Sequence, residues 1–225
     1  MKLTEDDHFG MDAGAFGTDV PITPQESFVR DTYIAVDEAT AGGMDRLRRE
    51  KGIVASCTLG CYHCCRYHIL TNTAEAHALG QYVKRELSVE QLGDLRKRTQ
   101  QWHAWDNSRP GRYRSAHIDE QTDLSNYDPC CPLLVDGVCS AYPVRPLACR
   151  THFVSSDPRS CCAANDPTST EDAPVVLRSV VTATSPFSRA MRDHIEEGGS
   201  DFSESLILLP HGLAIEMGWD FAIAQ

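Results

Sequence analysis

The chain has 225 residues, with 32 Asp and Glu against 21 Lys and Arg, and a formal net charge of -11 at pH 7. Its 41% of hydrophobic residues are enough to build a core, which excludes wholesale disorder. The excess of negative charge argues against nucleic acid and anionic membrane as partners, because both require a basic face. No pattern marks a surface for a protein partner.

Residues 1–22 are rich in Gly, Asp and Met and show no period, which predicts a flexible acidic arm; residues 23–225 then form a single domain. The opening sequence MKLTEDDHFGMD lacks the apolar stretch of a signal peptide. The longest aliphatic run, residues 206–209, is too short to span a bilayer. We therefore expect a cytoplasmic protein, in a compartment where thiols are kept reduced.

The first helix has clear start signals: Thr23 as N-cap, Pro24 at the first helical position and Glu26 three residues after the cap. The pair Gly42-Gly43 predicts the end of this helix or a break in it.

Two further helices follow the first cysteines. Asn72 with Glu75 predicts a helix start, with the helix running to about Leu87. Ser88 with Gln91 predicts a second capping box, followed by apolar residues at helical spacings up to the Pro110-Gly111 break.

Residues 127–170 are poor in periodicity and rich in Pro, Asp, Ser and Cys. Regular backbone hydrogen bonding therefore cannot order this long segment, and we expect a bound metal to do so. Ser185-Pro186 predicts the start of a helix that stops at Gly198-Gly199, and a short strand pair is expected near Val175 or Leu206. Together these signals predict a mainly α fold: a small α-rich, metal-stabilised domain with an irregular Cys-rich centre.

All ten cysteines lie between Cys57 and Cys162, and four of them fall within nine residues. Soft thiolates select zinc, copper(I) or iron-sulfur clusters. In a reducing compartment, clustered cysteines indicate metal ligands before disulfides. On one helix Cys57 and Cys64 would lie about 10.5 Å apart along the axis, too far to share a zinc ion. The segment is therefore a loop around its metal, or more than one metal atom lies along it.

Ten thiols permit two four-thiolate sites, an iron-sulfur cluster plus a zinc, or a polynuclear cluster. Any shared site requires two remote parts of the chain to converge, because 65 residues lie between Cys65 and Cys131. Arginines and histidines near the cysteines are candidates to offset thiolate charge or to add nitrogen ligands. They are Arg66, Arg145, Arg150, His63, His68 and His152.

The pattern Cys57-x3-Cys61-x2-Cys64-Cys65, then Cys131-Pro-Leu-Leu, then residues 136–150 as DGVCSAYPVRPLACR, resembles the YkgJ-type cysteine-cluster family over residues 55–165. That family is described as a zinc- or iron-chelating domain, with flagellin lysine methylase as a distant relative. The resemblance implies an eight-cysteine metal site. Its ligands would be Cys57, Cys61, Cys64, Cys65, Cys131, Cys139, Cys149 and Cys161. Cys162 is the alternative eighth ligand, and Cys130 is an extra cysteine with no counterpart in the family.

Three functions fit these residues. The first is a cytosolic binding protein that holds zinc or iron, including an iron-sulfur cluster. The second is an iron-sulfur or metal-dependent enzyme, such as a protein-modifying methylase that uses S-adenosylmethionine. The Cys57-x3-Cys61-x2-Cys64 spacing matches the radical S-adenosylmethionine motif, although the chain lacks the alternating strands and helices of that fold. The third is a redox sensor in which Cys130 and Cys162 are free and reactive.

Overall fold

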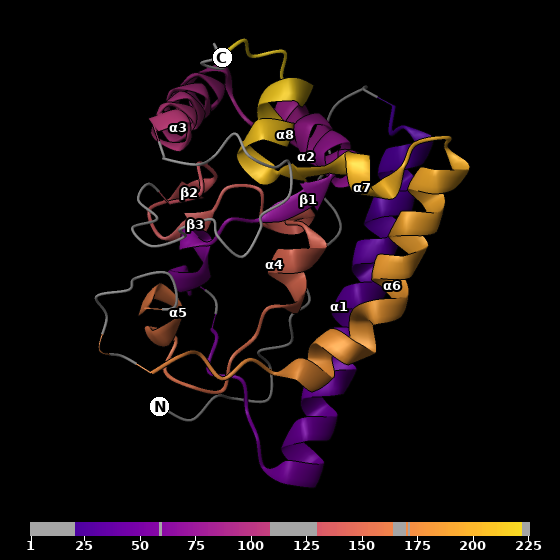
Figure 1. The fold of residues 1–225 in the computed structure, drawn as a ribbon, viewed down its shortest axis with the longest axis vertical. Helices are drawn as coiled ribbons and strands as arrows, with labels where there is room; N and C mark the ends of the chain where they lie inside the picture. The colour runs from indigo at the N-terminus through magenta and orange to yellow at the C-terminus, as the bar shows by residue number, and fades with distance from the viewer. Residues whose placement is uncertain (1–20, 59, 109–129, 164–169, 171, 222–225) are drawn as a thin grey trace.

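The computed structural model describes residues 21–58, 60–108, 130–163, 170 and 172–221, and the expected arm, apart from residues 21 and 22, lies outside this part. The described part is mainly helical, as predicted (Figure 1). In chain order its elements are α1 (Pro24–Lys51), η1 (His63–Arg66), β1 (Leu70–Asn72), α2 (Thr73–Glu86), α3 (Val89–Ser108), β2 (Leu134–Val135), β3 (Val138–Cys139), η3 (Tyr142–Val144), α4 (Leu147–Thr151), α5 (Ser160–Ala163), α6 (Arg178–Glu197), α7 (Phe202–Ser205), β4 (Leu206–Leu208) and α8 (Leu209–Glu216).

Helix α1 begins where the sequence predicts. The Thr23 side chain accepts a hydrogen bond from the Glu26 N–H, and Pro24 occupies the first turn. The predicted end at Gly42-Gly43 is wrong, since the helix continues to Lys51 and ends at Gly52 in a left-handed conformation, φ 65°. Helix α6 runs beside α1 (Figure 1) and packs Val180 against Gly43. This packing offsets the cost of about 1 kcal/mol that each interior glycine brings.

Helices α2 and α3 also begin at their predicted caps. The Asn72 side-chain oxygen accepts from the Glu75 N–H at 3.0 Å. Ser88 and Gln91 form a reciprocal capping box, with bonds of 2.8 and 3.2 Å between the backbone N–H of each and the side chain of the other. Pro110-Gly111, the predicted break after α3, lies outside the described residues.

Helix α6 starts seven residues earlier than predicted, at Arg178, and carries Pro186 in its interior. A proline inside a helix donates no N–H to the carbonyl four residues earlier, here that of Thr182. The Ser185 hydroxyl donates to that carbonyl at 2.9 Å instead. The Ser-Pro pair is thus compatible with a helix interior, and the predicted stop is confirmed, because α6 ends before Gly198.

Strand pairing is limited to two small antiparallel sheets within the described residues. Strands β1 and β4 pair with Leu70 opposite Leu208, which confirms the strand expected near Leu206. Near Val175 the structure has a single bridge between Val176 and Val154. Strands β2 and β3 form a hairpin whose two turn residues, Asp136 and Gly137, both have positive φ, the conformation that a two-residue hairpin turn of this kind requires.

The main core lies between α1, α2, α3, α6 and α8, and it includes Leu79, Leu95 and Met191. Leu133 and Val144 from the second cysteine segment are buried in this same core, and Cys131 and Cys139 pack against it. The irregular centre is therefore attached to the helical body through apolar contacts. In the described part of the chain no helix is both long and apolar enough to cross a membrane.

Candidate metal centre

In the described residues of the first cysteine segment, 57–58 and 60–65, a loop is followed by a single 3-10 turn, so one of the two alternatives left by the spacing, a loop, is present. The loop turns between Thr58 and Cys61, where the Cys61 N–H donates to the Thr58 carbonyl at 2.9 Å. The η1 turn then carries the adjacent Cys64 and Cys65, and the Cys65 N–H donates to the Tyr62 carbonyl at 2.9 Å. No single helix spans these four thiols, so they are free to gather in space.

The second cysteine segment, residues 130–162, presents its thiols from a series of short elements. Cys131 precedes the β2–β3 hairpin and accepts the Leu134 N–H at 3.0 Å through its carbonyl, while Cys139 ends the hairpin. Cys149 lies on α4 and Cys161 on α5. The stretch predicted to be irregular is thus organised as turns and single helical turns.

The two remote segments meet, and main-chain hydrogen bonds join them at two points. The Cys131 N–H donates to the Cys65 carbonyl at 2.8 Å. The Ser56 N–H donates to the Val154 carbonyl at 2.9 Å, and the Val154 N–H approaches the Cys57 Sγ at 3.5 Å. In Figure 1 the purple segment that carries η1 lies between α5 and the β2–β3 hairpin. The predicted convergence of the two cysteine segments is therefore confirmed.

None of the ten cysteines forms a disulfide, so cystine bridges do not hold the segments together. Burial raises the pKa of most of these thiols. It raises the pKa of Cys131 to about 12 and that of Cys161 to about 11. Cys64 differs, because its hydrogen bond with Cys65 lowers its pKa to about 7, while that same bond raises the pKa of Cys65.

Within the described residues, no group of three or more His, Cys, Asp and Glu side chains is arranged so that it could hold a metal ion. The neighbouring thiols instead influence one another: Cys65 lowers the pKa of Cys64, and Cys61 raises that of Cys57. Closing a coordination sphere therefore requires side-chain rotation around backbones that already lie together.

Two buried polar atoms beside the thiols test whether the site suits a thiolate-bound metal. The Tyr67 hydroxyl lies next to the Cys161 thiol and completes no hydrogen bond of normal geometry. The Arg145 Nε also lacks a partner, and the Arg145 guanidinium lies near Cys64, Cys139 and Cys149. Both atoms are donors in the neighbourhood of thiols, and donors of this kind support metal-bound thiolates in other proteins. Thiolate sulfur is the donor that soft metal ions prefer, so the chemistry of the donor set, though not its present side-chain arrangement, suits such an ion.

The sequence leaves Cys161 and Cys162 as alternatives for the eighth ligand, and the structure gives the two thiols different surroundings. Cys161 is 2% exposed and lies near Cys57, Cys61 and Cys64. Cys162 has its Sγ 3.0 Å from the Nδ1 of His63 and lies near Cys130, Cys61 and Arg66. The adjacent cysteines therefore have different surroundings, and Cys161 is the more buried of the two.

The other histidine candidates differ in their contacts. His152 places its Nε2 3.9 Å from the Cys161 Sγ, a long sulfur hydrogen bond, and burial lowers the pKa of His152, which favours the neutral ring. The His68 ring stacks on Trp105 with centroids 5.9 Å apart. His63 and His152 thus each approach one of the adjacent cysteines, Cys162 and Cys161.

Arg150 fixes the turn between η3 and α4 that carries Arg145 and leads to Cys149. It is 4% exposed, its Nε donates to the Arg145 carbonyl at 2.8 Å, and its guanidinium also bonds the Pro143 carbonyl and Asp37 of α1. The guanidinium further lies over the Tyr33 ring, 4.2 Å from the centroid. The arginine of the Cys-Arg pair therefore positions the turn through carbonyls and Asp37, while its charge also acts to lower the pKa of the Cys139 thiol.

The sequence predicts Glu75 only as part of a helix cap, whereas in the structure it also supports the cysteine segments. This carboxylate is 3% exposed and accepts four hydrogen bonds from other residues, from Tyr33, Thr71, Asn72 and the N–H of Leu147. The Leu147 bond, at 2.7 Å, anchors the start of the helix that carries Cys149. Only contacts between residues far apart in the chain identify this role.

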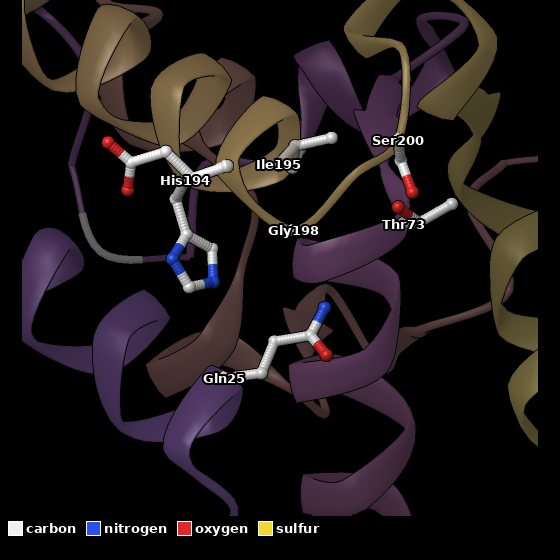
Figure 2. A pocket seen from close by; sticks show the side chains of 7 residues that line it. Gln25, Thr73, His194, Ile195, Gly198 and Ser200 are labelled. Carbon is white, nitrogen blue, oxygen red and sulfur yellow. The ribbon is translucent and has the colours of Figure 1, made fainter.

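A separate surface hollow of about 420 Å³ lies where the starts of α1 and α2 meet the end of α6 (Figure 2). Its lining includes Gln25, Thr73, His194 and Ser200, and it contains no cysteine. The His194 ring is stacked on Phe28 with centroids 3.9 Å apart. None of the candidate metal ligands predicted from the sequence lines this hollow, so the cysteine centre is the candidate site. Comparison of the chain with protein-family models, with curated proteins and with solved structures gave no match.

Proposed function

We propose that this protein is a cytosolic metal-binding protein that holds zinc or iron, including iron in an iron-sulfur cluster, through about eight cysteines. The observation that carries the proposal is the meeting of two cysteine segments with all thiols free of disulfides. Sulfur donors in this number favour zinc and iron over magnesium and calcium. The metal would supply Lewis-acid or redox chemistry, and the cysteines would supply the ligands.

The charge around the thiols supports this function. Buried thiolates without counter-charge are costly, because burial disfavours the ionised form. A divalent or trivalent ion removes that cost, since it binds the thiolates and releases their protons. Arg145 and the Tyr67 hydroxyl are in place to stabilise the negative charge that remains on the sulfur atoms.

The resemblance to the YkgJ-type family supports the same function, because it marks cysteines in both of the segments that main-chain hydrogen bonds join. Seven of the eight resembling positions occupy the first loop, the hairpin and α4, and Cys161 joins them from α5. The pairing of Cys161 with that group, rather than Cys162, is our assignment of the eighth ligand.

The test is anaerobic purification of the full chain, followed by elemental analysis and a visible absorption spectrum. A colourless protein with bound zinc, or a brown oxygen-sensitive protein with iron and acid-labile sulfide, would support the proposal. The control is the double variant Cys57→Ser, Cys131→Ser, which removes one sulfur from each segment and should lose most of the metal. A wild-type protein that holds no metal and stays folded in the presence of chelator would refute it.

A further inference from the structure

Three polar side chains outside the cysteine segments meet where the start of α1, the middle of α2 and the end of α8 come together. The Thr23 Oγ1 lies 3.3 Å from the Nε2 of His77. The Nδ1 of the same ring lies 3.1 Å from the Oε2 of Glu216. The ring thus stands between a hydroxyl and a carboxylate, and a different nitrogen faces each of them.

Close packing of α8 on α2 sets the distance between the ring and the carboxylate. A Cβ on Gly80, one turn after His77, would lie 2.6 Å from the Glu216 Cβ, so α8 approaches the bare backbone of α2 at this point. A Cβ on Gly212 would lie 2.9 Å from that of Ala76 in the same way. Because only glycine permits both approaches, the two helices are held together at the position where Glu216 meets the ring.

The carboxylate selects the tautomer of the ring. An ionised carboxylate only accepts hydrogen bonds, so the neutral His77 ring donates its Nδ1–H to Glu216. The Nε2 is then an acceptor, and it faces the Thr23 hydroxyl, which can donate to it. A hydroxyl nucleophile, a histidine base and a carboxylate that orients the base stand in this relation in hydrolases that use a triad.

The hollow of about 420 Å³ begins within one helical turn of these side chains (Figure 2). It is lined by Gln25, two residues after Thr23, and by Thr73, four residues before His77 and so on the same face of α2. The side chains of His77 and Glu216 are 22% and 24% exposed, so a small molecule can reach the ring. The hollow is large enough for a small molecule, since ligand sites occupy about 300–1,000 Å³.

The start of α1 favours the negative charge that develops during acyl transfer. The Glu26 N–H donates to the Thr23 Oγ1 itself, and Pro24 has no N–H. The Gln25 N–H lies between them and, like every N–H in a first turn, has no carbonyl within its own helix to bond. This donor and the positive end of the helix dipole therefore lie beside the hydroxyl, where they can stabilise an oxyanion.

We propose that Thr23 and His77, positioned by Glu216, hydrolyse small carboxylic esters. The Thr23 Oγ1 attacks the ester carbonyl carbon while its proton passes to the His77 Nε2. The C–O bond to the alcohol then breaks, and the Nε2 gives this proton to the leaving alcohol. Water attacks the acyl carbon and gives a proton to the Nε2, which returns it to the Oγ1 as the acyl bond breaks. The products are a carboxylic acid and an alcohol, and no cysteine takes part.

The experiment treats the full chain with a fluorophosphonate, a probe that phosphonylates activated hydroxyls, and locates the label by mass spectrometry of peptides. One label per chain is expected, at Thr23. Hydrolysis of p-nitrophenyl acetate is followed in parallel beyond ten equivalents per chain, because each of the ten cysteines could be acylated once. Continued release of p-nitrophenol beyond that amount is expected from the wild type.

The variants separate catalysis from helix capping. Thr23→Asn keeps a good N-cap for α1 but has no hydroxyl, so it should lose both label and turnover, whereas Thr23→Ser should keep both. His77→Gln should lower kcat by about 10²-fold or more. Glu216→Gln should lower kcat by about tenfold or more with less effect on KM, which a purely structural contact would not do.

Ser88→Ala is the matched control, because it removes a similar N-cap from α3 far along the chain from the triad and should keep wild-type turnover. A wild type that carries no label at Thr23, or turnover that survives in Thr23→Asn, would overturn the proposed hydrolysis. Either result leaves the proposed metal binding standing, since none of its cysteines enters this site.

Discussion

Replacing Glu75 with Gln changes one atom of the buried carboxylate that joins α1, β1, α2 and α4. All four neighbouring residues that hydrogen-bond to Glu75 donate, two to each carboxylate oxygen, so the amide nitrogen of Gln must face two donors. In each pair one donor is a hydroxyl, of Tyr33 or of Thr71, which can rotate to accept. The Leu147 N–H cannot, nor can the Asn72 amide, whose oxygen already serves the cap of α2.

One buried donor therefore loses its acceptor in Glu75→Gln, which should lower the free energy of unfolding by about 1–3 kcal/mol. Glu75→Ala leaves every one of these donors without an acceptor and should cost about 3–5 kcal/mol. Such losses are a large part of the total stability of an ordinary domain, which is about 5–15 kcal/mol.

Urea unfolding followed by circular dichroism measures these differences, with hydrogen exchange at the Leu147 N–H as the local readout. The matched control is Glu90→Gln in the exposed first turn of α3, which should change stability by about 0.5 kcal/mol or less. If Glu75→Gln were as stable as Glu90→Gln, and Leu147 exchanged no faster, the carboxylate would not be the junction we describe.

Four further outcomes are expected. Burial raises the pKa of Glu75 above its ordinary value of 4.5, so the folded state binds the carboxyl proton more tightly than the unfolded state does. The free energy of unfolding of the wild type, measured relative to Glu75→Gln, should therefore fall as the pH rises above 4.5. Urea titrations at several pH values measure this difference, and an increase with pH would contradict the sign. Gly212→Ala should lower the free energy of unfolding by about 1–3 kcal/mol, because its Cβ would lie 2.9 Å from that of Ala76. Gly42→Ala, with open space around the new Cβ, should raise it by about 0.5–1 kcal/mol. Equal effects of the two variants in urea unfolding would contradict this packing. Arg150→Lys should lose about 2 kcal/mol in the same assay, since an ammonium cannot reproduce the bonds of the buried guanidinium, and unchanged stability would show that charge alone matters. Adding chelator should lower the thermal midpoint while leaving the helical circular dichroism signal at room temperature, and no shift in protein shown to hold metal would mean that the ion adds no stability.

Local signals in the sequence predicted the helix starts, because a cap and its partner lie within three residues of each other. This holds for Thr23, Asn72 and Ser88. The two errors have tertiary or side-chain causes. Gly43 stays helical because α6 packs on it, and Pro186 is accommodated because Ser185 satisfies the exposed carbonyl.

For the site, the cysteine spacing predicted the meeting of the segments but not the arrangement of the thiols. Adjacent cysteines such as Cys161 and Cys162 look equivalent in the sequence, and only the packing of α5 on η1 separates their surroundings. The sequence did not predict the roles of Glu75 and Tyr67 beside the cysteine segments, because their partners Leu147 and Cys161 lie 72 and 94 residues away along the chain.

The main-chain bonds between the cysteine segments, Cys131 to Cys65 and Ser56 to Val154, do not involve a sulfur atom. Part of the contact between the two cysteine segments is therefore made by the peptide backbone and needs no ion, unlike the fold of a zinc finger, which is lost without its metal. In the proposed metal-binding function, part of the entropy of ordering the loops would already be lost on folding, and an incoming ion would mainly require rotation of thiol side chains. Loading and release of the ion would then need no refolding step.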